Sequence, residues 1–428
     1  MKFRYLLALF LLVCANAPLW AADDDDSESK GPPPEEIPDF NHLDEYIYTP
    51  KSTLNYGFRY SAGIKANFSG NGLIASPEAA LDHTTPDISR TYHDGTVNPD
   101  GRTMTVDTGD GISIVVPIIP DGKTNTWSYV SPSQITSDGF LQLHQYSAQT
   151  MDNEFHTTSR KGDMGWELTS ARDMGRLAKR LTWSLVGGMS VNDIQSATQS
   201  SVAATLYTVT DTYNLYGQTP PAAPYTAPST STQTAVDQNG NPTTVIGGVG
   251  QTVTVDTTTL ISSAPIASTA SATPITAASG EVINHFKLHG SYVTFRGGPE
   301  LSYELSPHLH LNISGGPALI YAGSQFTVDE VLIPATGGDI IDTLSDTQQK
   351  LLLGYYADAT LQYDFTDRSG LYFGAFYQNA GSYNQNANTG SNTAANSAYG
   401  STLGVGSYNT KVDFNETEGV RTGVSFRF

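Results

Sequence analysis

Between Leu54 and Phe68 every second side chain is apolar, and this alternation constrains the fold more than any other feature. The even positions hold Leu, Tyr, Phe, Ala and Ile, whereas the odd positions hold Asn, Gly, Arg, Ser and Lys. Successive side chains of a β-strand point to opposite faces, so the segment predicts a strand with one apolar and one polar face. A strand that crosses a bilayer needs about 9–11 residues, and this run exceeds that length.

The same alternation recurs along the chain. Further strands are expected around residues 164–173, 181–191, 293–305, 309–321, 351–365, 371–377 and 419–428. The connections alternate between short ones, at 175–179, 306–308 and 366–369, and long loops at 70–163, 195–290, 326–349 and 380–410. This organisation predicts an all-β fold, a transmembrane antiparallel up-and-down β-barrel of about eight strands. Alternating pieces such as Ile112–Ile119 and Phe140–Tyr146 leave ten to twelve strands as an alternative.

Aromatic residues indicate where the two membrane interfaces lie. In this arrangement Phe58, Trp183, Tyr303, Phe365, Phe373 and Phe426 fall near the short-turn end, and Phe68, Trp166, Phe295, Tyr321, Tyr355 and Tyr377 fall near the long-loop end. Aromatic belts at both interfaces are typical of a membrane barrel. The alternative is a secreted soluble β-sandwich, whose strands also alternate but rarely sustain so many outward apolar positions.

The first 22 residues predict a secretory signal peptide. Lys2 and Arg4 precede an apolar stretch at 5–13 and small residues up to Ala22. The single cysteine, Cys14, lies within this peptide, so the exported chain would contain no disulfide. Residues 23–50 are acidic and proline-rich and are expected to form a disordered leader. The barrel with its loops would then occupy residues 51–428.

Charge and motif content exclude several function classes. Acidic residues outnumber basic ones by 42 to 22, giving a net charge of -20, so nucleic acid is not an expected partner. His285 and His289, four residues apart, are the best candidates for a lipid-modifying enzyme, and Asp237–Asn241 resembles half of a calcium loop. Neither pattern is complete. The sequence therefore predicts no catalytic residues, no metal site and no cofactor.

Charged residues on the inward face predict a filled lumen. The expected network comprises Arg59, Lys65, Glu167, Asp173, Arg296, Glu300, Glu304 and Asp358, with His310 on the same face. Side chains fill the interior of an eight-stranded barrel. Because both signs are present, we expect a plug of ion pairs rather than a strongly selective pore.

The chain ends with Val424, Phe426 and Phe428 at alternate positions. Together with the signal peptide and the strand pattern, this ending resembles bacterial outer-membrane β-barrel proteins, most closely the small eight-stranded porin A and opacity type. The long loops depart from that group. The resemblance implies Sec-type export, an outer-membrane location, contact with outer-membrane lipid, and recognition of these three residues by the barrel-assembly machinery.

The function expected from this pattern is structural or adhesive. Long loops on a filled barrel would bind an extracellular ligand or a host surface. A small passive diffusion channel is the first alternative, favoured if the barrel has more strands. A barrel enzyme acting on lipid is the second.

Overall fold

The structure is a computed structural model, and it describes most of the chain after residue 50. The described residues are 51–74, 82–107, 113–152, 154–159, 162–228, 230–234, 244–245, 248–249, 252–256, 258–388 and 406–428. The expected signal peptide, the leader at 23–50 and the half calcium loop at 237–241 lie outside them. The chain divides into two units, Met1–Thr49 and Pro50–Phe428. Among the described residues, no helix is long and apolar enough to cross a membrane.

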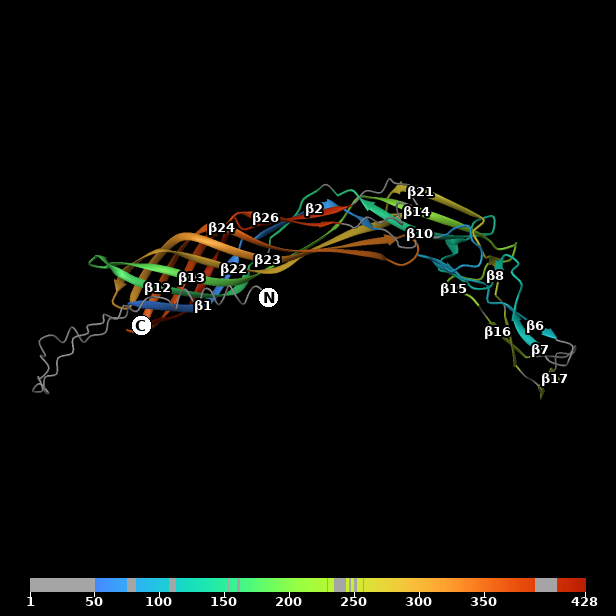
Figure 1. The fold of residues 1–428 in the computed structure, drawn as a ribbon, viewed down its shortest axis with the longest axis horizontal. Coiled ribbons are helices and arrows are strands. Elements are labelled where there is room, and N and C mark those ends of the chain that lie inside the picture. The colour runs from blue at the N-terminus through green and yellow to red at the C-terminus, as the bar shows by residue number, and fades with distance from the viewer. Residues whose placement is uncertain are drawn as a thin grey trace, which may run out of the picture. The chain divides into compact units, whose positions relative to one another are not determined.

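Eight antiparallel strands close into a barrel (Figure 1). They are β1 (Ser52–Ala62), β12 (Asp163–Ala178), β13 (Leu181–Ser201), β22 (Gly280–Ser306), β23 (Leu309–Pro334), β24 (Ile340–Thr366), β25 (Ser369–Asn379) and β28 (Thr417–Arg427). Each strand pairs with the next, and β28 pairs with β1 to close the ring. The predicted eight-stranded barrel is confirmed. The ten- to twelve-stranded alternative is wrong, because β10 (Phe140–Thr150) belongs to a separate sheet.

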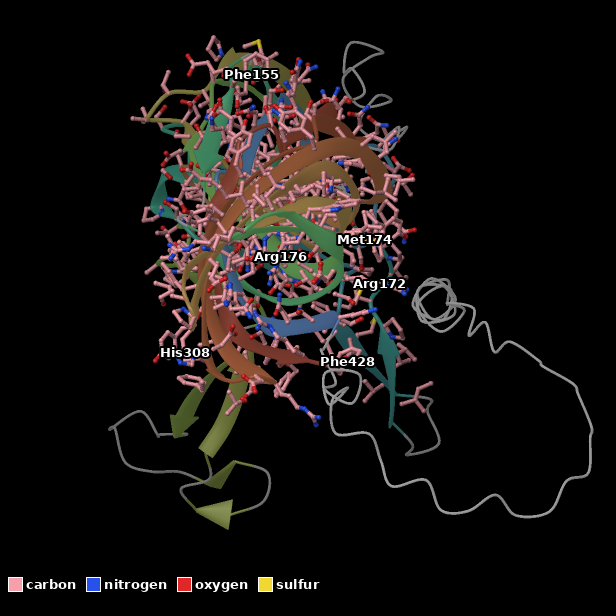
Figure 2. All side chains as sticks on the ribbon, turned by 90° about the vertical axis from the view of Figure 1, so that its left-hand side faces the viewer. Phe155, Arg172, Met174, Arg176, His308 and Phe428 are labelled. Atoms are coloured by element: carbon pink, nitrogen blue, oxygen red, sulfur yellow. The ribbon has the colours of Figure 1, made fainter. Side chains whose placement is uncertain are left out.

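The outer face of the ring is apolar, as the alternation predicts. Large side chains exposed around it include Tyr56, Phe58, Tyr60, Trp166, Leu185, Leu301, Tyr303, Ile313, Leu353, Tyr363, Phe373 and Phe426. The short connections are two-residue turns at 179–180, 307–308 and 367–368, and Figure 2 shows this end of the ring. One aromatic assignment is wrong: Phe58 and Trp166, expected in opposite belts, are direct partners with ring centroids 4.4 Å apart. The sequence alternation gives the face of a residue but not the register between strands.

At the long-loop end, four strands continue beyond the ring and their polarity reverses. Directly paired residues on the outward face form an apolar row, Val191, Val293, Tyr321 and Leu351. Two residues further along, the outward row is Asp193, Ser291, Gly323 and Gln349. Beyond this point the buried, inward side chains become apolar, among them Phe286, Phe326 and Val328. The same strands therefore expose an apolar face within the ring and a polar face outside it.

A second sheet covers the inner face of these strand extensions. It contains β11 (His156–Ser159), β2 (Lys65–Asn71), β27 (Ser407–Asp413) and β26 (Ser382–Asn388). Between the two layers lies an apolar cluster, here named the upper core, which includes Phe68, Phe286, Phe326, Tyr408 and Phe414. The ring therefore continues into a two-layered β-structure with a mostly apolar interior.

The predicted strand at 54–68 is in fact two strands. Gly63 has a φ of 94°, and a Cβ there would lie 2.0 Å from the carbonyl oxygen of Glu416. This backbone conformation, which favours glycine, separates β1 from β2. Phe68, expected in the outer aromatic belt, is instead fully buried, with its ring 5.4 Å from that of Phe286.

The segments expected as long loops contain much regular structure. β23 and β24 extend through most of the expected loop at 326–349, leaving only 335–339 as a connection, and β13 and β22 extend into the one at 195–290. The reason is that the strands do not end where the outward apolar pattern ends. A sheet of β21 (Ala267–Pro274), β14 (Ala204–Asn214), β10 and β3 (Leu73–Ile74) lies beyond them.

Smaller sheets complete the fold outside the ring. They are β15 (Tyr225–Thr226) with β9 (Trp127–Tyr129), β5 (Gly95–Val97) and β4 (Arg90–Tyr92); β20 (Ile261–Ser262) with β8 (Lys123–Thr124); β6 (Thr103–Asp107) with β7 (Ser113–Pro117); β16 (Thr230–Thr234) with β19 (Thr252–Asp256); and β17 (Thr244–Val245) with β18 (Gly248–Val249). A short 3₁₀ helix spans Pro132–Gln134. Trp127, Tyr129 and Leu141 belong to a separate apolar core here, so this region packs as a folded structure.

Candidate functional site: the filled barrel interior

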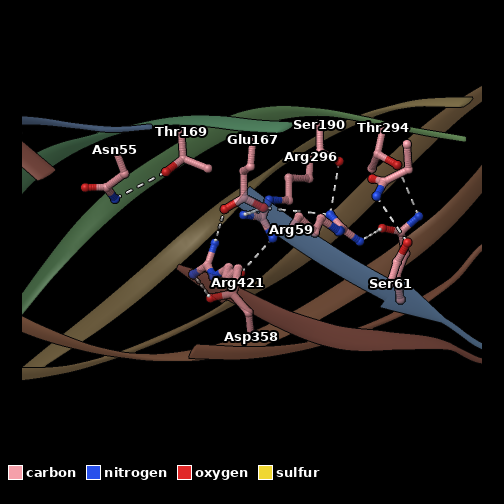
Figure 3. Close-up of polar contacts among 12 residues, drawn as sticks. Asn55, Arg59, Ser61, Glu167, Thr169, Ser190, Thr294, Arg296, Asp358 and Arg421 are labelled. Carbon is pink, nitrogen blue, oxygen red and sulfur yellow. Dashed lines mark hydrogen bonds and ion pairs between the residues drawn. The ribbon is translucent and has the colours of Figure 1, made fainter. Parts of the chain in front are cut away.

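Five charged side chains from five strands meet inside the ring (Figure 3). They are Arg59 on β1, Glu167 on β12, Arg296 on β22, Asp358 on β24 and Arg421 on β28, here named the lumen network. Each residue exposes between 0% and 8% of its surface. The inward face of the alternation places these side chains in the lumen, and their length lets strands on opposite sides of the ring reach one another.

Two carboxylates and two guanidinium groups form a closed ring of ion pairs. Glu167 lies 3.0 Å from Arg296 (Oε2 to Nη2) and 3.0 Å from Arg421 (Oε1 to Nη1). Asp358 lies 3.0 Å from Arg296 (Oδ2 to Nη1) and 2.7 Å from Arg421 (Oδ1 to Nη2). Each arginine thus bridges both carboxylates. This geometry offsets the desolvation of buried charges, which a single ion pair often fails to do.

Arg59 extends the lumen network toward the long-loop end. Its guanidinium donates to Ser190 Oγ at 3.1 Å and to Gln378 Oε1 at 2.9 Å. It also lies 3.8 Å from Glu167 Oε2 and stacks 3.6 Å from the centroid of the Phe376 ring. Polar partners and a cation–π contact stabilise a cation that has no exposed surface.

Tyr292 connects the polar lumen to the upper core. Its hydroxyl lies 3.0 Å from Ser61 Oγ, and its ring meets Phe414 edge-on at 5.2 Å between centroids. From the short-turn end upward, the described interior is therefore ionic around Glu167 and mostly apolar beyond Tyr292. Both parts consist of buried side chains, so the interior is filled at each of these levels.

A second polar group occupies the short-turn end of the lumen. Asp364 lies 2.8 Å from Arg427 and 3.2 Å from His310, and Gln362 donates to Asp364 at 2.8 Å. His310, placed on the inward face by the sequence, therefore does point inward. It pairs with Asp364 rather than with the lumen network.

Two residues predicted for the network, Lys65 and Asp173, lie elsewhere in the structure, and two more line the lumen outside the ring of ion pairs. Lys65 is on β2, outside the ring, where it is exposed and pairs with Glu416 at 3.0 Å. The turn at Gly63 moves it out of the lumen. Asp173 is exposed near the β12–β13 turn. Glu300 and Glu304 lie on the inward face of β22, where Glu300 is close enough to Asp358, Arg296 and Arg421 for electrostatic interaction and Glu304 is directly opposite His310.

Arg421 is a member that the sequence interpretation missed. It lies in the last strand, where only the outward positions Val424, Phe426 and Phe428 were singled out. The same alternation places Arg421 and Arg427 on the inward face, so the signal was present. In the structure Val424, Phe426 and Phe428 are exposed on the outside of the ring, and Phe428 pairs with Ser52 through two backbone hydrogen bonds.

The histidine pair of the enzyme alternative lies on the outward face of a strand extension. His285 and His289 are the direct partners of Asp329 and Gln325 on β23. Lys287, between them, pairs with Asp329 at 2.7 Å. Within the described ranges, no cluster of three or more His, Cys, Asp or Glu side chains could hold a metal ion.

Comparison with known proteins finds matches among solved structures. No family model matches the chain, and no curated protein matches it. The solved structures that it resembles include the outer membrane protease OmpT from Escherichia coli, at 6% identity and a TM-score of 0.27, covering 89% of this chain and 97% of that one. A Pseudomonas aeruginosa FadL homologue has 10% identity and a TM-score of 0.17, covering 88% and 90%. The outer-membrane expressed OmpT of Vibrio cholerae has 8% identity and a TM-score of 0.10, covering 89% and 99%.

These TM-scores are too low to carry an argument about function. The assignment of the fold rests on the closed ring of eight strands itself.

Proposed function

We propose that this chain is an outer-membrane β-barrel that acts as a filled scaffold, and that its sheets beyond the ring bind an extracellular ligand or a host surface. The proposal rests on the contrast between the lumen of the ring and the sheets beyond it. The lumen holds a buried ion-pair network, while the segments between the strands build folded sheets with their own apolar cores. Binding residues are commonly presented on loops held by such a rigid scaffold.

An outer-membrane location is supported by the apolar outer face and by the signal peptide expected at residues 1–22. The apolar residues of this face are exposed around the whole ring, as they would be in contact with acyl chains. Export through the Sec pathway and recognition of Val424, Phe426 and Phe428 by the assembly machinery belong to the same proposal. Cell fractionation of a tagged chain, with and without residues 1–22, tests the location.

The scaffold role and the channel alternative make opposite predictions in a planar bilayer. The chain is refolded from residue 23 onward, and a change in gel mobility on boiling shows that the barrel has formed. We expect a folded barrel without discrete conductance steps, since the lumen network is buried. Reproducible conductance steps would instead support a passive channel.

The binding role is tested by removing a peripheral part of the sheets. β16 pairs only with β19 among the described strands, so replacing residues 229–257 by a short linker leaves the sheet of β21, β14, β10 and β3 paired. Cells that display the full chain should adhere to one another or to protein-coated surfaces more than cells that display the shortened chain. Equal adhesion by the full chain and by cells that lack the protein would contradict the role.

We further propose that the chain is not an enzyme. Its best candidate residues are His285 and His289, which lie on an outward strand face beside Lys287 and Asp329. Lipid hydrolysis by the refolded chain that is lost when both histidines are changed to alanine would overturn this proposal.

A further inference from the structure

Exposed basic residues gather at the short-turn end of the barrel, in a chain whose net charge is -20. They are Lys51, Arg172, Arg176, Lys179, Arg180 and Arg368, four of which belong to the β12–β13 hairpin. Figure 2 labels Arg172 and Arg176 of this group. The carboxylates of Asp173 and Asp367 lie on the same turns. Asp173 accepts a hydrogen bond from the backbone of Gly175 at 2.8 Å. The hairpin from Arg172 to Leu181, here named the basic hairpin, thus has a clear excess of positive charge.

Two apolar side chains of the basic hairpin lie at irregularities in the strand pairing. The register between β12 and β13 shifts between Asp173 and Gly175, and again between Arg176 and Ala178. The residues skipped by the pairing are Met174 and Leu177, and they are 49% and 59% exposed. Met174 keeps the outward parity of Trp166 and Arg172, whereas the shift turns Leu177 away from the inward direction that the ordinary alternation would give it.

The basic hairpin is continuous with the apolar outer face of the ring. Arg172 is the direct partner of Leu185, which is 55% exposed on that face. Gly175 is opposite Trp183, one of the aromatic residues expected at this interface. A long cationic side chain at this height can place its stem along the apolar surface and its charge at the height of the headgroups.

We propose that the basic hairpin binds the anionic headgroups of phospholipids in the leaflet at the short-turn end. Arg172, Arg176, Lys179 and Arg180 contact the phosphates, while Met174 and Leu177 enter the boundary between headgroups and acyl chains. Binding of a soluble polyanion would account for the basic residues, but not for the exposed apolar side chains of Met174 and Leu177. An apolar and basic surface at an interface is the composition that binds anionic lipid. The inference rests on the proposed membrane insertion, but not on the surface-binding role.

The test compares lipid binding by native mass spectrometry of the refolded chain in neutral detergent. Phosphatidylglycerol and phosphatidylcholine are titrated in turn. We expect a preference for phosphatidylglycerol that weakens as salt is raised, because salt screens exposed charges. Each basic residue near a membrane surface contributes about fivefold in affinity. The variant R172Q/R176Q/K179Q/R180Q should therefore bind phosphatidylglycerol on the order of 600-fold more weakly.

A matched control changes the same number of cations outside the ring. The variant K123Q/K287Q/K350Q/K411Q alters the net charge equally and should keep the preference for phosphatidylglycerol. The variant M174S/L177S should bind both lipids more weakly while retaining the dependence on salt. Gel mobility before and after boiling shows that each variant has folded, so a failure of insertion is distinguishable from a failure of lipid binding.

Three results would overturn the inference. The first is an unchanged ratio of phosphatidylglycerol to phosphatidylcholine in the basic-hairpin variant, and the second is an equal loss in the control variant. The third is displacement of phosphatidylglycerol by millimolar inorganic phosphate, which would identify a site for small anions rather than for lipid.

Discussion

Replacing Glu330 by glutamine should remove a pH dependence from the stability of the sheet that covers the upper core. Glu330 lies on β23 beyond the ring and is fully buried. Its Oε1 accepts a hydrogen bond from the Tyr408 hydroxyl at 2.6 Å, and Asn284 Nδ2 and Thr150 Oγ1 each lie 3.0 Å from that hydroxyl. Burial, reinforced by the nearby carboxylate of Asp342, raises the pKa of Glu330 from 4.5 to about 7.

The sign of the effect follows from this raised pKa. Below about pH 4.5, Glu330 is protonated in both the folded and the unfolded state, so it causes no pH-dependent loss of stability. Between pH 4.5 and 7 the folded state keeps a proton that the unfolded state releases, and stability falls as the pH rises. Above pH 7 the loss is complete, and it amounts to about 3 kcal/mol at 1.36 kcal/mol per pKa unit.

Hydrogen exchange of β27 measures this loss, because Tyr408 connects β27 to Glu330. After correction for the intrinsic rate, protection of β27 in the wild-type chain should fall by about a hundredfold between pH 4.5 and 8 relative to the Glu330→Gln variant. The pKa of Asp342 is also raised by burial, but Asp342 is present in both chains, so its contribution cancels. Parallel pH profiles for the two chains would refute the reasoning.

Three further changes test other parts of the structure. Glu167→Gln weakens the ion pairs of Arg296 and Arg421 and should cost about 3–5 kcal/mol in urea unfolding followed by tryptophan fluorescence, with Glu304→Gln as a nearly neutral control. Phe326→Ala should cost about 3–5 kcal/mol by opening a cavity in the upper core. Proteolysis should then increase beyond the ring, while gel mobility on boiling still reports a folded barrel. Deleting Phe428 should lower the amount of barrel in the outer membrane, measured by fractionation, without changing export.

The eight strands of the ring could be predicted because both of their faces are tightly constrained. Outward side chains are apolar and exposed, and inward ones are buried among polar and charged neighbours, so the alternation between Leu54 and Ala62 or between Leu351 and Phe365 is nearly strict. The same constraint placed Arg59, Glu167, Arg296 and Asp358 correctly on the inward face. Their mutual contacts depend on the register between strands, which no single sequence pattern gives.

The parts outside the ring could not be predicted in the same way. The pairings of β2 with β27 and of β10 with β14 join segments far apart in the chain, and their strands carry ordinary short alternation. Lys65 lies outside the lumen because the backbone turns at Gly63. A glycine within an alternating pattern does not by itself indicate that the strand ends there. The wrong loop boundary at residue 326 had a different cause, the reversal of polarity along β23.

The reversal of polarity along β23 explains how the barrel is joined to the sheets beyond the ring. β23 contains 26 residues, which at about 3.4 Å each give roughly 90 Å of strand, about three times the thickness of a hydrocarbon core. In the proposed outer-membrane location, a strand of this length extends beyond the lipid. Because its pairing with β22 and β24 continues past Tyr321, its outward face changes from apolar to polar while its inward face changes from polar to apolar. The upper core is then anchored directly in the strands that form the ring. A surface partner bound beyond the ring would therefore contact a hydrogen-bonded extension of the barrel wall rather than a separate loop.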